Sequence, residues 1–516
     1  MGRFLRLFHT LRHLRLQQIF YQVLYRLSGK LQSRPQRSKY QESSNDLCRQ
    51  NQSGKSAGPR SFDLPTLFNG RASFTSLNVV KDFGEVSSIN WNFNQPGKLW
   101  TYNLNYFEFI RQAEVKVSDA QELIDDWITK SGTHLDGWEP YPLSLRIVHW
   151  IRFYRERRIA MPGHVISSLH QQYHNLQSRI EYHLMGNHLL ENAIALTMAA
   201  EFFDDKKYLK KASSLLTRQL KEQYLTTGAH YERSTMYHCI LLWRLLDLYA
   251  EVKFPAKTSA SAGTALGGRP CYFEVLKKSI VRQLNWLRYV VDENGNYPHF
   301  NDSTDGIAPS AKSVLDYATE LDPYFEQPAT TPVIPTETVH WSWPRKHPMM
   351  DVWIDASSVG PSYIPGHAHA DDLTFCVALN GQRVIVDPAI STYEKNARRS
   401  WERSTVAHNT VTVNQQNSSD VWGGFRVGKR ARTTIEHLEG GTKLVARHDG
   451  YPDNHRRSFE LIDSGMQITD EYAGQAVARF HFDHTCPVQL ANDQLTGKDF
   501  TIDWSTSGKA KLGTYQ

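Results

Sequence analysis

Apolar residues recur at three- and four-residue spacing between about residues 101 and 320, which is the period of an amphipathic helix. Short polar stretches separate these segments, apart from a low-complexity insert at 257–268 that predicts a surface loop. Helices that follow one another across short joints pack as antiparallel neighbours, so this half predicts a helical hairpin array or an incomplete (α/α) toroid. The expected helices span 117–130, 141–158, 163–184, 187–204, 206–224, 234–252 and 272–292.

The pattern changes after a proline-rich stretch at 323–345, which we predict to be a linker. Beyond it, short runs of Val, Ile, Thr and Phe alternate with Gly, Asn and Asp turns, as in an antiparallel β-sandwich. We therefore expect an α+β multidomain protein, with a helical toroid at 63–322 and a β-sandwich at 346–516. The expected strands span 350–358, 373–379, 383–387, 410–414, 430–436, 442–448, 456–462, 466–472 and 477–484.

Residues 2–30 keep the helical spacing, but arginines interrupt every apolar run. This predicts a basic amphipathic helix that either packs on the domain behind it, which we favour, or lies on a membrane surface. It does not fit a cleavable signal peptide, because no uninterrupted apolar core and no small-residue cleavage site are found. A polar linker at 31–62 completes an N-terminal region of residues 1–62. We expect a cytoplasmic or membrane-peripheral location ahead of general secretion, with a periplasmic location left open.

The 516-residue chain has a modest net charge of +6 and many aromatic residues, with 24 Tyr, 23 Phe and 13 Trp. Aromatic side chains suit a carbohydrate cleft, although they suit a large helical core equally well. The positive charge favours an acidic partner such as a polyanionic glycan, whereas its diffuse distribution argues against nucleic acid. Five scattered cysteines without a C-x-x-C pair argue against a disulfide framework. No run approaches ~18 apolar residues, so we expect no transmembrane helix.

Two stretches of the helical half gather side chains that can hold or move protons. Asn187, His188 and Glu191 lie within four residues of one another at the start of a strongly apolar helix, so they share one face. Asn187 and Glu191 also fit a simple helix cap and capping box. The second stretch contains Tyr231 and Tyr237, which are either core tyrosines or, in one case, a catalytic acid and base.

The β half contains the H-x-H pair His367 and His369 within G-H-A-H-A-D-D. In an extended strand these two side chains share a face, which would point them together at a cleft or at a metal. Asp387 follows in V-D-P and His408 follows in A-H-N-T-V. Two imidazoles and one carboxylate are a plausible transition-metal set. The alternative is a pair of loop histidines and a turn aspartate.

Five motifs, taken together and in their order along the chain, resemble those of the heparinase II/III family of polysaccharide lyases. They are N-H-x-x-E-N, Y-E-x-S-x-x-Y-H, G-H-x-H-x-D, V-D-P and S-T-x-A-H-N-T-V. The resemblance covers about residues 95–485 and implies a helical toroid followed by an antiparallel β-sandwich, in agreement with the periodicity. The N-terminal helix resembles the leader helices of members linked to bacterial surface-polysaccharide loci. It does not resemble the signal peptides of the secreted degradative members.

The resemblance also implies roles for individual residues. The implied roles are carboxylate neutralisation by Asn187, a position lining the site for His188 and Glu191, catalysis by Tyr237, a substrate-facing position for His367, and zinc ligation by His369, Asp387 and His408. This zinc ion would be structural, since a catalytic zinc needs an open position beside the substrate. Asp371 or Asp372 would support the histidines that bind it.

The implied reaction is β-elimination on an anionic polysaccharide that contains uronic acid. The C5 proton of a uronate is weakly acidic, so its carboxylate must be neutralised, and Asn187 and His188 at a helix N-terminus fit this task. Tyr237 is the best candidate acid for the leaving oxygen. The base stays open between Tyr237 itself, His367 and His188.

Further side chains are candidates for binding the substrate. The stretch 395–403 is either a solvated charged loop or a basic, aromatic wall in which Arg399 and Arg403 grip a polyanion. The remaining substrate-binding candidates are Glu191, Tyr231, Arg233, Trp138 and Tyr141.

Two other functions stay open at this point. A glycoside hydrolase on the same scaffold would need two opposed carboxylates, for which Glu191 and Glu232 are the available pair. The second is a non-catalytic glycan-binding protein of a polysaccharide assembly system. The residue set argues against it, because a protein that only binds glycan does not require Asn187, His188, Tyr237 and His367 together.

Overall fold

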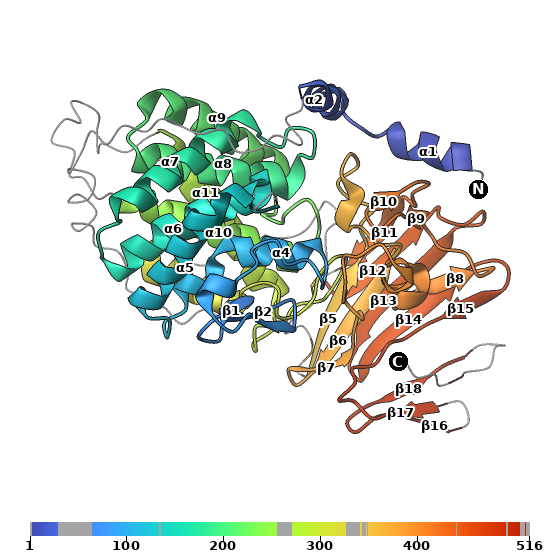
Figure 1. The fold of residues 1–516 in the computed structure, drawn as a ribbon. Coiled ribbons are helices and arrows are strands. Elements are labelled where there is room, and N and C mark those ends of the chain that lie inside the picture. Colours follow the sequence, from blue (N-terminus) through green and yellow to red (C-terminus); the bar gives the residue numbers. More distant parts are fainter. Residues whose placement is uncertain are drawn as a thin grey trace.

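The computed structural model describes residues 3–28, 64–133, 136–254, 271–326, 341–342, 347, 349–439, 441–491, 494–505 and 511. Its helices gather in one half of the molecule and its larger β-sheets in the other, and the helical half comes first along the chain (Figure 1). The predicted fold class, a helical domain followed by antiparallel sheets, is therefore confirmed.

Each helix that the apolar spacing predicts is present. The largest difference is at α7, which ends six residues early at Ser178. Two helices, α4 and α12, are not predicted by the pattern. The helices of this half are α4 (Lys98–Tyr106), α5 (Val117–Lys130), α6 (Pro140–Arg157), α7 (Gly163–Ser178), α8 (Gly186–Phe202), α9 (Lys206–Gln223), α10 (Thr235–Lys253), α11 (Cys271–Val290) and α12 (Ala311–Leu321). Short 3-10 turns are η1 (Val86–Ser88), η2 (Glu108–Arg111), η3 (Ser131–Thr133), η4 (Asp136–Trp138) and η5 (Pro323–Glu326).

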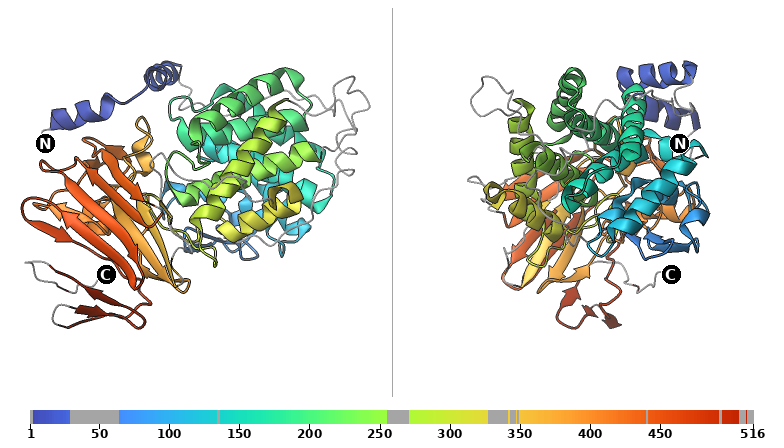
Figure 2. Two further views of the ribbon diagram at one scale, coloured as in Figure 1. Left: turned by 180° about the vertical axis from the view of Figure 1, so that it is seen from behind. Right: turned by 60° about the vertical axis from the view of Figure 1, so that its left-hand side comes forward.

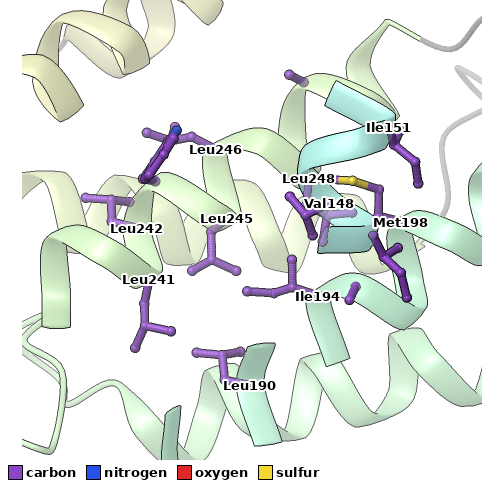
Figure 3. Close-up of a cluster of buried hydrophobic side chains, with 14 of the residues drawn as sticks. Val148, Ile151, Leu190, Ile194, Met198, Leu241, Leu242, Leu245, Leu246 and Leu248 are labelled. Carbon is purple, nitrogen blue, oxygen red and sulfur yellow. The ribbon is translucent and has the colours of Figure 1, made fainter. Parts of the chain in front are cut away.

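The core of the helical half is built around α8 and α10. Both helices are buried on nearly every side, which explains why their sequences are apolar around most of the circumference. They pack against each other, and α8 also packs against α6. Figure 3 shows the aliphatic side chains of the three helices meeting, among them Val148, Ile194 and Leu245.

The β half is a sandwich of two four-stranded antiparallel sheets. Apolar side chains from both sheets, such as Ile354 and Phe375 from one and Leu444 and Phe459 from the other, form a single core between them. The first sheet contains β4 (Trp341–Ser342), β5 (Met350–Asp355), β6 (Thr374–Leu379) and β7 (Gln382–Ile385), and the second contains β11 (Thr433–Glu439), β12 (Lys443–His448), β13 (His455–Ile462) and β14 (Gly465–Glu471).

Smaller elements complete the two halves. Of the strand predicted at 477–484, the first residues pair as β15, and Phe482 forms an isolated bridge with Ile385. A three-stranded sheet at 66–82 belongs to the helical half. The small strands are β1 (Thr66–Phe68), β2 (Ser73–Ser76), β3 (Val79–Asp82), β8 (Val411–Val413), β9 (Val421–Trp422), β10 (Arg426–Val427), β15 (Ala476–Ala478), β16 (Gln489–Ala491), β17 (Gln494–Thr496) and β18 (Thr501–Asp503), and the short helices of the β half are η6 (Pro365–His367), α13 (Ala397–Glu402) and η7 (Thr405–Ala407).

The two halves share part of their core. Trp353 of β5 is buried, and its indole Nε1 donates a 2.7 Å hydrogen bond to the Val290 carbonyl at the end of α11. The predicted linker at 323–345 begins instead with η5, whose Phe325 packs into the helical core. Most of the rest of that stretch lies outside the described residues, as do the predicted linker at 31–62 and the predicted loop at 257–268.

The N-terminal region forms two helices rather than one, α1 (Arg3–Leu11) and α2 (Leu16–Leu27). They cross the top of the molecule, with α1 over the β half and α2 beside the helical half (Figures 1 and 2). Arg6 forms a 2.8 Å ion pair with Asp420, and the Tyr25 hydroxyl donates a 2.7 Å hydrogen bond to the Ile180 carbonyl. These helices thus pack on the protein. Within the described ranges, no helix is long and apolar enough to cross a membrane.

Candidate active site

A cavity of about 1190 Å³ lies where the helical half, the β half and the N-terminal helices meet. All four residues predicted to be catalytic line it. Its wall includes Tyr102, Tyr106, Tyr141, Asn187, His188, Tyr237 and Arg244 from the helical half, Gly366, His367, Tyr393, Phe425 and Arg430 from the β half, and Leu7, Leu11, Leu14, Ile19 and Val23 from the N-terminal helices.

The position of Asn187 is fixed by Glu232. The Glu232 carboxylate accepts 2.9 Å hydrogen bonds from both the backbone N and the side-chain Nδ2 of Asn187, so it caps α8. The preceding Gly186 has φ +59°, and a Cβ there would lie 2.6 Å from Glu232 Oε1, so this close approach requires glycine. Burial alone would raise the pKa of Glu232, but His367, His230 and the Asn187 bonds hold that pKa below its usual range.

His367 reaches the cavity from the 3-10 turn η6 of the β half. Its Nδ1 lies 2.9 Å from Asp302 Oδ2, and its Nε2 lies 3.3 Å from both Asn187 Nδ2 and Glu232 Oε2. A carboxylate at Nδ1 favours the tautomer that is protonated there. Nε2 is then the nitrogen that remains for chemistry at the cavity.

Tyr237 stands beside His367, with their ring centroids 4.1 Å apart. It lies in the first turn of α10, which Ser234 caps. The Tyr237 hydroxyl donates a 3.1 Å hydrogen bond to the hydroxyl of Tyr393, a cavity residue that sequence reasoning did not identify. Burial, together with the nearby Asp302 carboxylate, raises the pKa of Tyr237 well above its usual range, so the phenol is protonated at neutral pH.

His188 faces the cavity from the same helix turn as Asn187. Its Nδ1 lies 3.0 Å from Glu181 Oε1, and its ring packs on Tyr141 at 4.4 Å between centroids. Burial opposes its protonation, but the Glu181 carboxylate outweighs burial and raises the pKa of His188 above its ordinary value. The imidazole therefore tends toward the charged form next to the cavity.

Asp302 is a second residue that sequence reasoning missed. It lies in the chain segment between α11 and α12 and is fully buried. Besides its bond with His367, its carboxylate accepts a 2.8 Å hydrogen bond from His369 Nε2 and hydrogen bonds of 2.5 and 2.7 Å from Arg399. Burial opposes its ionisation, but Arg399 and the two histidine bonds hold the pKa of Asp302 well below its usual range. The only signal in the sequence is a run of turn-forming residues, Asn301-Asp302-Ser303.

A group of donors that can hold a metal lies behind His367. His369, Asp371 and His408 are buried, and one ligand atom of each lies within 4.8 Å of the others. Among the described residues, His369 Nδ1, Asp371 Oδ2 and His408 Nε2 have no hydrogen-bond partner. Burial raises the pKa of Asp371 well above its usual range, so this carboxylate needs a cation beside it to stay ionised.

Asp387 takes a different place from the predicted one. Its Oδ2 lies 2.8 Å from His408 Nδ1, the nitrogen that faces away from the group, while Asp371 supplies the carboxylate within the group. Among the described residues the structure thus groups Asp371, rather than Asp387, with the two histidines, although Asp387 Oδ1 is also buried without a hydrogen-bond partner. Asp387 instead orients His408, in the way a carboxylate commonly supports a metal-binding histidine.

The predicted basic wall is corrected by the structure. Arg399 and Arg403 are buried behind the cavity, because Arg399 pairs with Asp302 and Arg403 donates to the Ala368 carbonyl at 2.8 Å. Charge in a sequence does not reveal whether an arginine faces solvent or an interior acceptor.

Other predicted contact residues also lie away from the cavity wall. Trp138 packs on Trp127, Tyr231 packs on Tyr363, and Arg233 is half-buried against Gly360. Glu191 is buried beneath the cavity 4.0 Å from Arg244, and burial raises its pKa to about 7. Of the predicted substrate-binding set, Tyr141 alone is part of the cavity wall formed by the described residues.

Comparison with known proteins agrees with this arrangement. A family model described as heparinase II/III N-terminus matches residues 153–327, and one described as heparinase II/III-like, C-terminal matches residues 329–508. The chain belongs to the heparinase II/III-like family.

Two curated relatives are both described as heparin-sulfate lyases. The relative from Bacteroides thetaiotaomicron is 22% identical in an alignment of 472 residues, which covers 78% of this chain and 64% of the relative. The relative from Pedobacter heparinus is 24% identical in an alignment of 332 residues, which covers 60% of this chain and 47% of the relative. This chain thus spans less than two thirds of the length of either.

The fold is also found in solved structures. A heparinase III crystal structure has a TM-score of 0.57 at 16% identity, covering 80% of this chain and 70% of the other. A heparan sulfate lyase mutant from Pedobacter heparinus has a TM-score of 0.50 at 18% identity, covering 92% and 78%. At these identities the likeness establishes the fold alone.

The charge state of His188 gives a test of the site. Replacing Glu181→Gln removes the carboxylate that stabilises the imidazolium most, so that only the weaker effects of Glu232 and Glu191 still oppose burial. We expect the pKa of His188, followed by NMR, to lie above 6.5 in the wild type and to fall below it in the variant. His188 would then lose its charge at a lower pH. Glu139→Gln, a carboxylate that is not bonded to His188, should leave the titration unchanged, and an unchanged titration in Glu181→Gln would contradict the assignment.

Proposed function

We propose that this protein is a polysaccharide lyase that cleaves a uronic-acid-containing anionic glycan by β-elimination. The observation that carries the proposal is that Asn187 and Tyr237 of the helical half meet His367 of the β half around one cavity. Membership of the heparinase II/III-like family and relatives described as heparin-sulfate lyases support it.

The first requirement of the reaction is to neutralise the uronate carboxylate, so that charge developing on C5 is stabilised. His188 and Asn187 lie in the first turn of α8, where the helix dipole favours a negative group. Six cationic side chains line the cavity against three carboxylates, which also favours an anionic glycan. These cations are Arg26, Lys98, Arg244, Lys395, Arg426 and Arg430.

The geometry supports a division of the proton transfers between two side chains. His367 Nε2 takes the C5 proton, since Asp302 holds the proton of its other nitrogen. The electron pair forms the C4–C5 double bond, the C4–O4 bond breaks, and Tyr237 donates its proton to the leaving oxygen. Glu232 Oε2, 3.3 Å from His367 Nε2, stabilises the imidazolium. Tyr237 is better suited to act as the acid than as the base, because burial and the Asp302 carboxylate disfavour its phenolate form.

The hydrolase alternative finds less support. Both oxygens of Glu232 accept hydrogen bonds from Asn187, and Glu191 is buried and does not line the cavity. Hydrolysis normally needs two carboxylates that flank the scissile bond. Neither glutamate is placed as an exposed acid or nucleophile.

We further propose that His369, Asp371 and His408 bind a divalent metal ion, with zinc as the best match to two imidazoles and a carboxylate. The three unpartnered buried donor atoms support this assignment. The metal would be structural, tying the 366–372 loop to the segment before β8. Asp302 would orient His369, and Asp387 would orient His408.

The lyase reaction is tested by the ultraviolet absorbance of the unsaturated uronate product. Wild type and Tyr237→Phe would be incubated with heparan sulfate, hyaluronan, chondroitin, alginate and bacterial capsule extracts. We expect absorbance to rise with at least one glycan, and Tyr237→Phe to lower kcat by about 100- to 10,000-fold because the leaving oxygen loses its acid.

Tyr472→Phe, an exposed tyrosine of the β half, should leave the rate unchanged and serves as the matched control. New reducing ends without ultraviolet absorbance would identify hydrolysis and contradict the proposal. Full activity in Tyr237→Phe would remove this residue from the proton transfer.

The metal assignment is tested by elemental analysis and thermal unfolding. We expect the purified protein to carry roughly one zinc per chain and chelation to lower Tm, since a ligand bound only to the folded state stabilises it. His408→Ala should lose the metal, and Asp387→Asn should weaken its binding by about 10- to 100-fold. His437→Ala, an exposed histidine on β11, should bind as the wild type does. A Tm that responds to neither chelator nor added zinc would contradict the assignment.

A further inference from the structure

The helix α2 is packed with its polar face inward. Its apolar residues Leu16, Ile19, Phe20, Val23, Leu24 and Leu27 follow the helical period and form one face, yet all six are exposed, with Leu16 and Leu27 each 84% exposed. The residues that face the protein are Gln18, which bonds the Tyr363 carbonyl at 3.3 Å, and Tyr25, which bonds the Ile180 carbonyl. A helix on a water-exposed surface normally has the reverse arrangement.

The helix α1 repeats this arrangement over the β half. Arg6 pairs with Asp420, and the Thr10 hydroxyl accepts a 3.2 Å hydrogen bond from the Trp422 indole. The apolar side chains Phe4, Leu5, Leu7, Phe8 and Leu11 are exposed. The polar and ionic contacts to both halves of the protein therefore hold the two helices with these apolar side chains exposed, four of them at the cavity.

The resulting surface, which we call the N-terminal apolar face, consists of the eleven exposed side chains named above. They make up eleven of the 24 large apolar side chains that are exposed among the described residues. Concentrated apolar surface of this kind marks a site of interaction. The following residues, 31–62, are rich in Ser, Gln, Asn, Arg and Gly and supply few apolar side chains that could cover it.

The charge around this face indicates what covers it. Residues 1–28 contain five arginines and no carboxylate. Arg12 and Arg26 are exposed, and neither pairs with a carboxylate within the described part of the chain. An apolar helix face flanked by arginines fits the boundary between acyl chains and anionic head groups. We propose that α1 and α2 dock on a lipid surface that carries anionic head groups, lying in its plane.

This docking would also orient the cavity. Leu7, Leu11, Ile19 and Val23 belong both to the N-terminal apolar face and to the wall of the cavity. The rim of the cavity is thus continuous with the lipid-binding surface. The protein would reach its substrate from the membrane boundary, while its binding to lipid depends on none of the proposed catalytic residues.

The test is flotation of the full chain with vesicles of phosphatidylcholine containing phosphatidylglycerol, compared with phosphatidylcholine alone. We expect binding to the anionic vesicles and weak binding to the neutral ones. Leu16→Asp/Phe20→Asp/Leu27→Asp should lower partitioning by more than about tenfold, because three apolar side chains lose their burial in lipid. Arg12→Glu/Arg26→Glu should remove the preference for anionic vesicles.

The matched control is Val79→Asp/Val80→Asp/Val477→Asp, which alters three exposed apolar residues elsewhere and should bind as the wild type does. Thermal unfolding should show that each variant is folded, since all the altered side chains are exposed. Absence of vesicle binding by the wild type, or equal binding by the Leu16/Phe20/Leu27 variant, would overturn the proposal. So would a dimer that fails to bind vesicles and that this variant converts to a monomer, since a second copy would then cover the face.

Discussion

The carboxylate of Asp302 is the interaction on which the site depends. It belongs to the helical half, but its partners His367, His369 and Arg399 all belong to the β half. The backbone N of Asp302 also donates to the His367 carbonyl at 3.1 Å. Because this carboxylate is fully buried, its charge is tolerated only with all of its partners in place, and removing one partner of such a pair typically costs about 3–5 kcal/mol.

The Asp302 carboxylate links the histidine of the cavity to the candidate metal group. One oxygen bonds the histidine that faces the cavity, and the other bonds a histidine of the candidate metal group. One buried carboxylate thus fixes the positions of both His367 and His369. The shared core around Trp353 and the N-terminal helices that span both halves fix the same junction from two further sides.

Much of the fold could be predicted because the apolar period directly reports which face of a helix or strand is buried. The ends of α5 and α10 follow the predicted ranges to within a residue. The sequence motifs identified four candidate catalytic residues, and the structure brings them to one cavity. They are Asn187, His188, Tyr237 and His367. For the N-terminal helix the sequence left packing on the protein and a membrane surface as alternatives, since periodicity identifies an apolar face but not what the face contacts.

The remaining residues of the site depend on tertiary contacts that leave little trace in a sequence. Asp302 lies in a turn without periodicity, and its importance arises only when η6 and α13 approach it. Arg399 was expected at the substrate because it is charged, whereas its guanidinium is taken up by Asp302. Asp371 and Asp387 are both aspartates near His408, and only the path of the loops decides which one joins the metal group.

The most direct test of this account is the tautomeric state of the two histidines, read from nitrogen NMR of the imidazole rings in the wild type and in Asp302→Asn. A single carboxylate between them predicts that His367 carries its proton on Nδ1 and His369 on Nε2, and that both signals shift in the variant. If His367 were protonated on Nε2 alone, or if Asp302→Asn left both signals unchanged, Asp302 would not be the group that organises the site.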